Sequence, residues 1–198
     1  MGLTIHYNGH LRTKVSLPAL VEEVKDIAKI HQWPFEIYET EFPLHRFNRK
    51  KHSNLLYGIC FTPPECEKVS LCFLSNGQLV GFWSWQLFVK TLGKDKGFLE
   101  GGASVKTQYA GEVIHKTLIH LLDYLSKKYF RSFTMADEGK YWETRDEKLL
   151  QKKFSTLTGL LKTLSGIIET TPINPKEPFE KYFEGILKEV HAQNKLSK

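Results

Sequence analysis

The chain has 198 residues, of which 41% are hydrophobic and 25% are charged. These fractions are ordinary for a folded domain, and they exclude a wholly disordered chain. The 28 lysines and arginines outnumber the 22 aspartates and glutamates, which gives a net charge of +6. Because charges of both signs are interspersed, this surplus is more typical of a solvated surface than of a nucleic-acid-binding protein.

The cysteines and the apolar runs indicate the cellular compartment of the protein. Cys60, Cys66 and Cys72 include no C-x-x-C pair and have no histidine at metal-ligand spacing. We therefore expect free thiols, no metal site, no cofactor and a reducing cytoplasm. The first residues lack the basic and apolar regions of a signal peptide, and no apolar run reaches the length of a membrane span. We expect a soluble cytoplasmic protein without a membrane partner.

In chain order, the first half predicts one helix among several strands. Residues 3–9 alternate apolar and polar side chains, which is typical of a half-buried strand. Residues 17–31 repeat apolar side chains every three or four positions and predict a helix. Strands are expected over 35–42, 55–62 and 69–74, and the last two should be central because they are apolar on both faces.

A basic segment at residues 45–52 follows the second expected strand. It contains Arg46, Arg49, Lys50 and Lys51 around an aromatic residue, a composition that is able to contact phosphate groups. A solvated loop between strands is the first interpretation. Nucleic-acid binding through these four residues is the alternative.

The dipeptide Asn-Gly at residues 76–77 predicts a tight hairpin that leads into a strand over residues 79–89. In a strand, Trp83 and Trp85 share one face. Such an aromatic stripe belongs more often to a core than to a site. The alternative is a binding surface built on these two tryptophans.

The segment from Ala103 to Thr144 predicts a strand, a long helix, a second strand and an acidic turn. The strands are expected over residues 103–109 and 132–137, and the helix over residues 111–130. If the two strands lie parallel in one sheet, the helix between them forms a crossover connection.

The long helix carries His115 and His120. A separation of five residues corresponds to about 140° around a helix, so the two side chains cannot share a metal ion. We expect both histidines at the surface or at the edge of the buried face.

The acidic turn holds the candidate catalytic residues. Asp137, Glu138 and Lys140 resemble the carboxylate and lysine set of metal-dependent nucleases, in which the acids bind a divalent cation and the lysine stabilises charge on the phosphate. That family places its second acid and its lysine two apart on a strand, whereas a glycine interrupts the string here and favours a turn. Tyr141 and Trp142 follow directly and are binding candidates.

Two long helices are expected at the C-terminal end. Thr144 and Glu147 have the spacing of a capping box, and the helix after them carries an apolar seam with a repeat of about 3.5 residues, which is typical of helix pairs. We expect a single domain over residues 1–170 and a C-terminal helical extension over residues 171–198, which packs on the domain or on a partner. The alternative is that these helices pair with those of a second copy and form a homodimer.

These elements predict an α+β fold, with a mixed, mostly antiparallel sheet of about six to seven strands and helices packed mainly on one face. The sequence contains no complete catalytic constellation, so the first hypothesis is a non-enzymatic binding protein whose partner is a protein or a small molecule. The first alternative is a metal-dependent phosphodiester hydrolase that uses Asp137, Glu138 and Lys140. The second alternative is nucleic-acid binding through residues 45–52.

Overall fold

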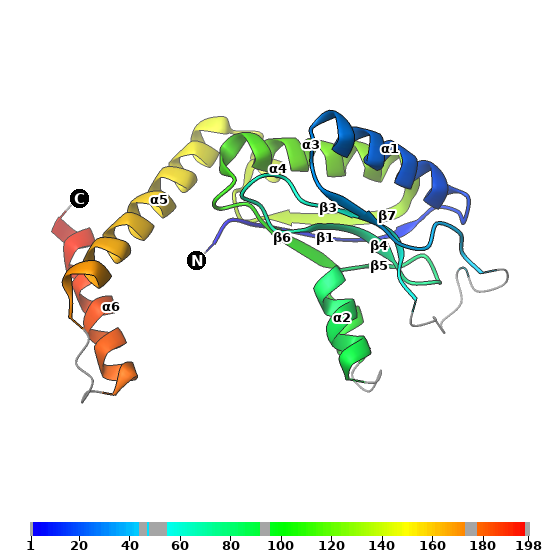
Figure 1. Cartoon of the computed structure of the whole chain (residues 1–198). Coiled ribbons are helices and arrows are strands. Elements are labelled where there is room, and N and C mark those ends of the chain that lie inside the picture. The colour runs from blue at the N-terminus through cyan, green and yellow to red at the C-terminus, as the bar shows by residue number, and fades with distance from the viewer. Residues whose placement is uncertain (1, 44–46, 48–54, 92–95, 173–177, 197–198) are drawn as a thin grey trace. The chain divides into compact units, whose positions relative to one another are not determined.

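The computed structural model describes residues 2–43, 47, 55–91, 96–172 and 178–196. These residues form an α+β protein with seven strands in two sheets, as expected from the sequence (Figure 1). The chain divides into two compact units, residues 2–150 and the residues from 151 onward. This division falls inside a helix, whereas the sequence analysis placed the start of the C-terminal extension at residue 171.

The first sheet has three strands in the order β6-β1-β7. Its central strand, β1 (Thr4–Leu11), pairs antiparallel with both β6 (Ala103–Lys106) and β7 (Phe130–Asp137). The two outer strands are therefore parallel to each other, and α3 (Gly111–Tyr129) connects them. The expected crossover is present, with β1 between its two strands.

The second sheet is an antiparallel meander in the order β2-β3-β4-β5. Its strands are β2 (Phe35–Ile37), β3 (Tyr57–Phe61), β4 (Val69–Phe73) and β5 (Leu79–Val80). Every residue of β3 and β4 is buried. This burial explains why both faces of these two strands are apolar in the sequence.

The predicted strand over residues 79–89 is wrong beyond its second residue, because α2 (Phe82–Lys90) replaces it. The segment satisfies both periods: its tryptophans are two apart, which suits a strand, whereas Phe82, Trp85 and Phe88 are three apart, which suits a helix. The helical spacing prevails because these three side chains pack against one buried cluster, formed by Leu56, Cys60, Cys72, Leu74, Val80 and Leu99.

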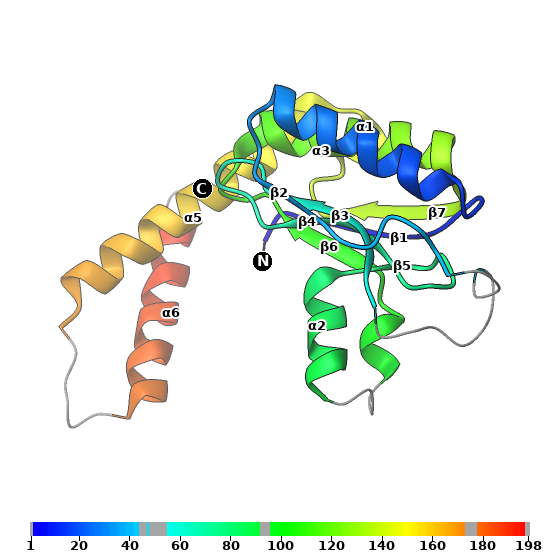
Figure 2. The ribbon, with the colours of Figure 1, turned by 45° about the vertical axis from the view of Figure 1, so that its right-hand side comes forward.

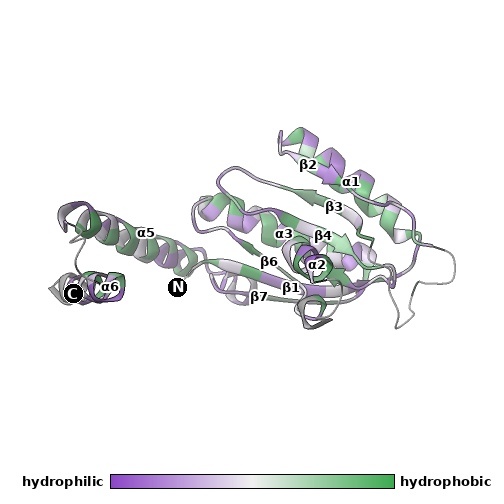
Figure 3. Cartoon of the chain, turned by 60° about the horizontal axis from the view of Figure 1, so that its bottom comes forward, coloured by the Kyte–Doolittle hydropathy of each residue, from purple (hydrophilic) through white to green (hydrophobic). Residues whose placement is uncertain are grey.

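Helices cover the two faces of the core unit unequally. α1 (Ser16–Ile30) and α3 lie side by side on one face, whereas α2 lies on the opposite face (Figures 1 and 2). A 3₁₀ turn, η1 (Lys96–Leu99), follows α2. Seen from the side of α2, the strands β6, β1 and β7 lie open (Figure 3). Polar side chains such as His6, Ser104 and Thr134 are exposed along these strands.

Two long helices, α5 (Glu147–Thr170) and α6 (Phe179–Leu196), end the described chain. The predicted capping box has the wrong capping residue. Oδ1 of Asp146, rather than the Thr144 hydroxyl, accepts the hydrogen bond from the backbone N–H of Leu149, at 3.0 Å. The Thr144 hydroxyl instead donates to the carbonyl of Lys140 at 2.6 Å and accepts from the backbone N–H of Asp146 at 3.2 Å.

Candidate functional site

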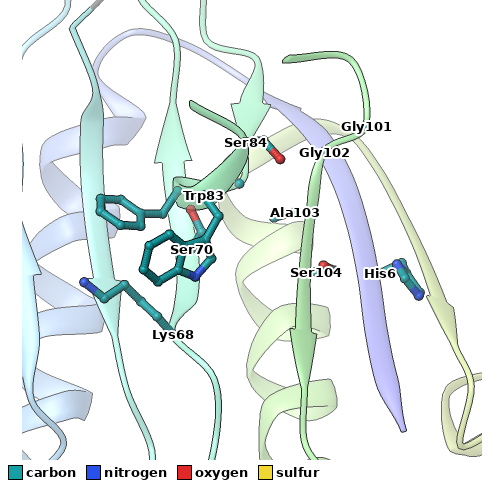
Figure 4. A pocket seen from close by; sticks show the side chains of 11 residues that line it. His6, Lys68, Ser70, Trp83, Ser84, Gly101, Gly102, Ala103 and Ser104 are labelled. Carbon is teal, nitrogen blue, oxygen red and sulfur yellow. The ribbon is translucent and has the colours of Figure 1, made fainter. Parts of the chain in front are cut away.

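A polar pocket opens where the two sheets separate. Backbone hydrogen bonds join the sheets at several points. At two of these points, the N–H of Glu67 donates to the carbonyl of Lys106 at 3.2 Å, and the N–H of Gly81 donates to the carbonyl of Gly102 at 2.9 Å. Between these points lies a pocket of about 140 Å³. Its lining includes His6, Lys68, Ser70, Trp83, Ser84 and Ser104 (Figure 4).

Gly102 makes the close approach of the strands possible. Its φ is +71°, a backbone conformation that residues with a side chain rarely adopt. A Cβ atom at this position would lie 2.6 Å from the carbonyl oxygen of Tyr7 and 2.8 Å from Cβ of Asn8. The pocket wall therefore depends on a glycine at the entry to β6.

Tyr7 joins the two sheets beside the pocket. Its hydroxyl donates to the carbonyl of Ser70 and accepts from the N–H of the same residue, both at 3.0 Å. The side chain of Ser70 in turn donates to the carbonyl of Val80 at 2.9 Å. Burial raises the pKa of Tyr7 far above its ordinary value, so the hydroxyl stays protonated. These bonds fix the β4 side of the pocket.

Trp83 is the residue that distinguishes this pocket from the rest of the surface. Its side chain is 60% exposed at the pocket, whereas Phe88 on the same helix is buried and Phe82 and Trp85 are partly buried against the core cluster. In the view of Figure 4 its indole ring lies next to the side chain of Lys68. The ring of Phe82 supports it edge-on, at 5.1 Å between centroids. Trp85, the second predicted tryptophan, packs against the buried cluster instead.

Lys68 contributes less positive charge to the pocket than its position suggests. Its Nζ donates to Oε1 of Glu36 at 2.8 Å and lies 4.5 Å above the ring centroid of Phe82. The hydrogen bonds from Lys68 and from Tyr38 lower the pKa of Glu36, so the carboxylate remains charged beside the ammonium group. The pocket therefore offers hydrogen-bonding groups and an aromatic face rather than a net charge.

His6 links the pocket to the acidic turn. It projects from β1 and its Nε2 lies 3.7 Å from Oε1 of Glu138. The other carboxylate oxygen of Glu138 accepts from the backbone N–H of Thr4 at 2.9 Å. Glu138 thus caps the end of the β1–β7 pairing, and this role accounts for one of the predicted catalytic residues.

Asp137 is buried, with 1% of its surface exposed. Its Oδ1 accepts from the N–H of Gly139 (2.6 Å) and lies 3.0 Å from Nε2 of His115, and its Oδ2 accepts from the N–H groups of Tyr141 (2.7 Å) and Trp142 (3.1 Å). Three backbone N–H groups and the imidazole of His115 thus surround the two carboxylate oxygens, which face the inside of the turn.

Burial and the neighbouring groups shift the pKa of Asp137 in opposite directions. Burial alone raises the pKa, but the hydrogen bond and charge of His115, together with the backbone donors, outweigh it. The net result is a pKa below the ordinary value, so the side chain is ionised at neutral pH.

His115 is fully buried, which contradicts the expected surface or edge position. Its Nδ1 lies 2.6 Å from Oγ1 of Thr107, a hydroxyl that also donates to the carbonyl of Leu3 at 3.1 Å. The sequence carried the signal for this burial, because His115 stands three and four residues before Leu118 and Ile119 on the buried face of α3. The spacing between His115 and His120 alone does not reveal this buried face.

The aromatic residues of the acidic turn lie away from the pocket. Tyr141, the first residue of α4 (Tyr141–Thr144), is buried, and its hydroxyl lies 3.2 Å from Nε2 of His120. The guanidinium of Arg145 lies 4.7 Å above the ring of Trp142. These contacts fold the turn against α3. Tyr141, Trp142 and Arg145 do not line the pocket.

Lys140, the third predicted catalytic residue, has a φ of +66° and its ammonium group lies 3.7 Å from Oε1 of Glu143. It points toward this exposed carboxylate in the turn. The remaining predicted site residues, Arg46, Arg49, Lys50 and Lys51, lie outside the residues that the structure describes.

Among the residues that the structure describes, no group of three or more His, Cys, Asp or Glu side chains is placed to hold a metal ion. No helix in this part of the chain is long and apolar enough to cross a membrane. The three cysteines are free thiols. Cys60 and Cys72 are buried with their Sγ atoms 3.3 Å apart, and burial raises the pKa of Cys66 to about 12.

Comparison with protein-family models, with curated proteins and with solved structures found no match to this chain.

Proposed function

We propose that the chain is a non-enzymatic binding protein and that the pocket beside Trp83 takes a small, uncharged ligand with a flat ring. The observation that carries this proposal is the exposure of Trp83 at a polar pocket, while Phe82 and Trp85 on the same helix pack against the core. A large aromatic side chain that remains exposed beside hydrogen-bonding groups is typical of a ligand-binding wall.

The lining favours a neutral ligand over an ion. The charge of Lys68 is balanced by Glu36, as described above. The imidazole of His6 and the hydroxyl of Ser104 offer hydrogen bonds on the β1 and β6 side (Figure 4). Pockets for drug-sized ligands measure roughly 300–1,000 Å³, so a pocket of about 140 Å³ suits a smaller molecule or one ring of a larger one.

The acidic turn supports a non-enzymatic function. Hydrolysis of a phosphodiester by a bound cation needs carboxylate oxygens that are free to coordinate it. The oxygens of Asp137 are used by three backbone N–H groups and by His115. Because this carboxylate is buried as well, it holds the turn together and lies out of reach of a substrate.

A screen of small ring compounds by thermal shift tests the proposal. We expect hits that raise the melting temperature of the wild type and not of Trp83→Ala, because that variant loses the aromatic wall. The matched control is Tyr109→Ala, which removes a ring that is 65% exposed elsewhere. Hits that stabilise Trp83→Ala as much as the control would argue against this pocket.

A second candidate function is protein binding through the C-terminal helices. α6 exposes Phe179 (71%), Phe183 (42%) and Leu187 (41%), which are spaced four residues apart on one side of the helix. Exposed apolar residues in such a row are typical of a helix that packs on another protein. Light scattering on the chain with and without residues 171–198 tests it. The deletion should abolish any association that these helices mediate.

A further inference from the structure

β7 is an edge strand whose middle residues lack the usual protection of an edge. It is eight residues long and, among the described strands, pairs only with β1. Its residues 132–136 contain no proline and no charged side chain, the features with which proteins commonly blunt a sheet edge, and the charged Arg131 and Asp137 lie outside them. An edge of this kind is a template for another strand.

The pairing with β1 determines which backbone groups of β7 are free. The N–H of Glu138 donates to the carbonyl of Thr4, and Ala136 and Thr134 stand opposite the next alternate residues of β1. Because the direction of the backbone groups alternates along a strand, the N–H and C=O groups of Phe133 and Met135 point away from β1. No hydrogen bond to them is found in the described part of the chain.

The unpaired edge of β7 is limited at both of its ends. At one end, the N–H of Asp137 donates to Oε1 of Glu143 at 3.3 Å. At the other end, the pairing with β1 shifts register between His10 and Leu11, which distorts the strand near Phe130. The usable edge is therefore short, and its middle residue is Thr134.

We infer that β7 pairs with the β7 strand of a second copy of this chain, in antiparallel orientation about a two-fold axis at Thr134. This register sets Phe133 of each copy opposite Met135 of the other. Each of these pairs exchanges two backbone hydrogen bonds, so the contact contains four. The two outward residues stand symmetrically about Thr134, and a symmetric edge is complementary to itself.

The side chains fit the same register. Phe133 and Met135 are only partly buried in one copy, and pairing would bring each phenyl ring against a thioether sulfur, a favourable contact. The side chain of Thr134 is exposed and would meet its own copy across the axis, and Thr–Thr pairs stabilise neighbouring strands. This register uses residues of β7 and none of the residues that line the pocket.

Sedimentation velocity over a range of protein concentrations tests the inference through a charge exchange at the axis. In Thr134→Lys and in Thr134→Glu each copy meets its own charge, so we expect dimerisation to weaken by about fivefold or more in either variant. An equimolar mixture of the two should restore the dimer. Ser132→Lys is the matched control, because it lies on the same face, away from the axis, and should leave the dimer intact.

A second measurement needs no variant. Hydrogen exchange of the backbone amides of Phe133 and Met135 should slow as the wild-type concentration rises, while the amide of exposed Tyr109 should not change. A wild type that stays monomeric at every concentration would overturn the inference. So would a dimer that Thr134→Lys leaves intact, since such a dimer must use another surface.

Discussion

The Nε2 atom of His115 lies 3.0 Å from Oδ1 of Asp137, and both side chains are shielded from solvent. His115 lies on the buried face of α3, and Asp137 is the last residue of β7. Their contact therefore connects the helix to the strand that follows it. Thr107, just after β6, holds the other ring nitrogen. The three residues join the two ends of the crossover through its helix.

The first prediction concerns the stability that Asp137 provides. Asp137→Ala leaves His115 and three backbone donors without their acceptor, so the free energy of unfolding should fall by about 3–5 kcal/mol in a urea titration. Glu138→Gln, at the neighbouring exposed position, should cost about 1 kcal/mol or less. Equal losses in the two variants would mean that the buried carboxylate has no special role.

The second prediction concerns acid. The pKa of Asp137 is lower in the folded chain than its ordinary value, so its ionised form contributes stability above the unfolded pKa of about 3.9, and this contribution is lost as the pH falls through the folded pKa. The stability difference between wild type and Asp137→Asn should be largest at neutral pH and should narrow below about pH 4. Urea titrations at several pH values measure it. A difference that widens in acid would contradict the ionised state.

The third prediction concerns the joint between the sheets. Tyr7→Phe removes the hydroxyl that both donates to and accepts from Ser70, and it leaves two buried backbone groups unpaired. The expected loss is about 1–3 kcal/mol. Tyr109→Phe removes an exposed hydroxyl and should change stability by about 0.5 kcal/mol or less. If the two variants unfold at the same urea concentration, the joint contributes nothing.

The fourth prediction separates the two tryptophans of α2. Trp85→Ala removes a ring from the buried cluster and should cost about 2 kcal/mol or more. Trp83→Ala removes an exposed ring and should cost about 1 kcal/mol or less. Thermal or urea unfolding decides between them. The reverse order would place Trp83 in the core and remove it from the pocket.

Much of the fold was predictable because the apolar periods were unambiguous. The stripes of α1 and α3 and the two-sided apolar strands β3 and β4 each admitted one interpretation. The segment from Phe82 to Lys90 admitted two, because its aromatic residues satisfy both the strand and the helix period. The segment is a helix because this conformation packs its aromatic side chains against a buried cluster from distant strands, which includes Cys60 and Cys72.

The candidate site was less predictable than the fold. Trp83 was named from the sequence as part of an aromatic surface, but its pocket is assembled from β1, β4 and β6, which are far apart in the chain. Lys68, Ser70 and Ser104 have no motif that marks them. Asp137 was named for catalysis, since a carboxylate that holds a buried turn and one that binds a metal look alike in a sequence.

The most direct measurement of the central claim is an NMR titration that follows the indole N–H signals of the four tryptophans. The probe is a set of small, neutral ring compounds, added to labelled wild type and to Trp83→Ala. The proposed pocket predicts compounds that shift the Trp83 signal most and that no longer bind to the variant. Compounds that bind both proteins alike, or that shift only Trp33 or Trp142, would contradict it.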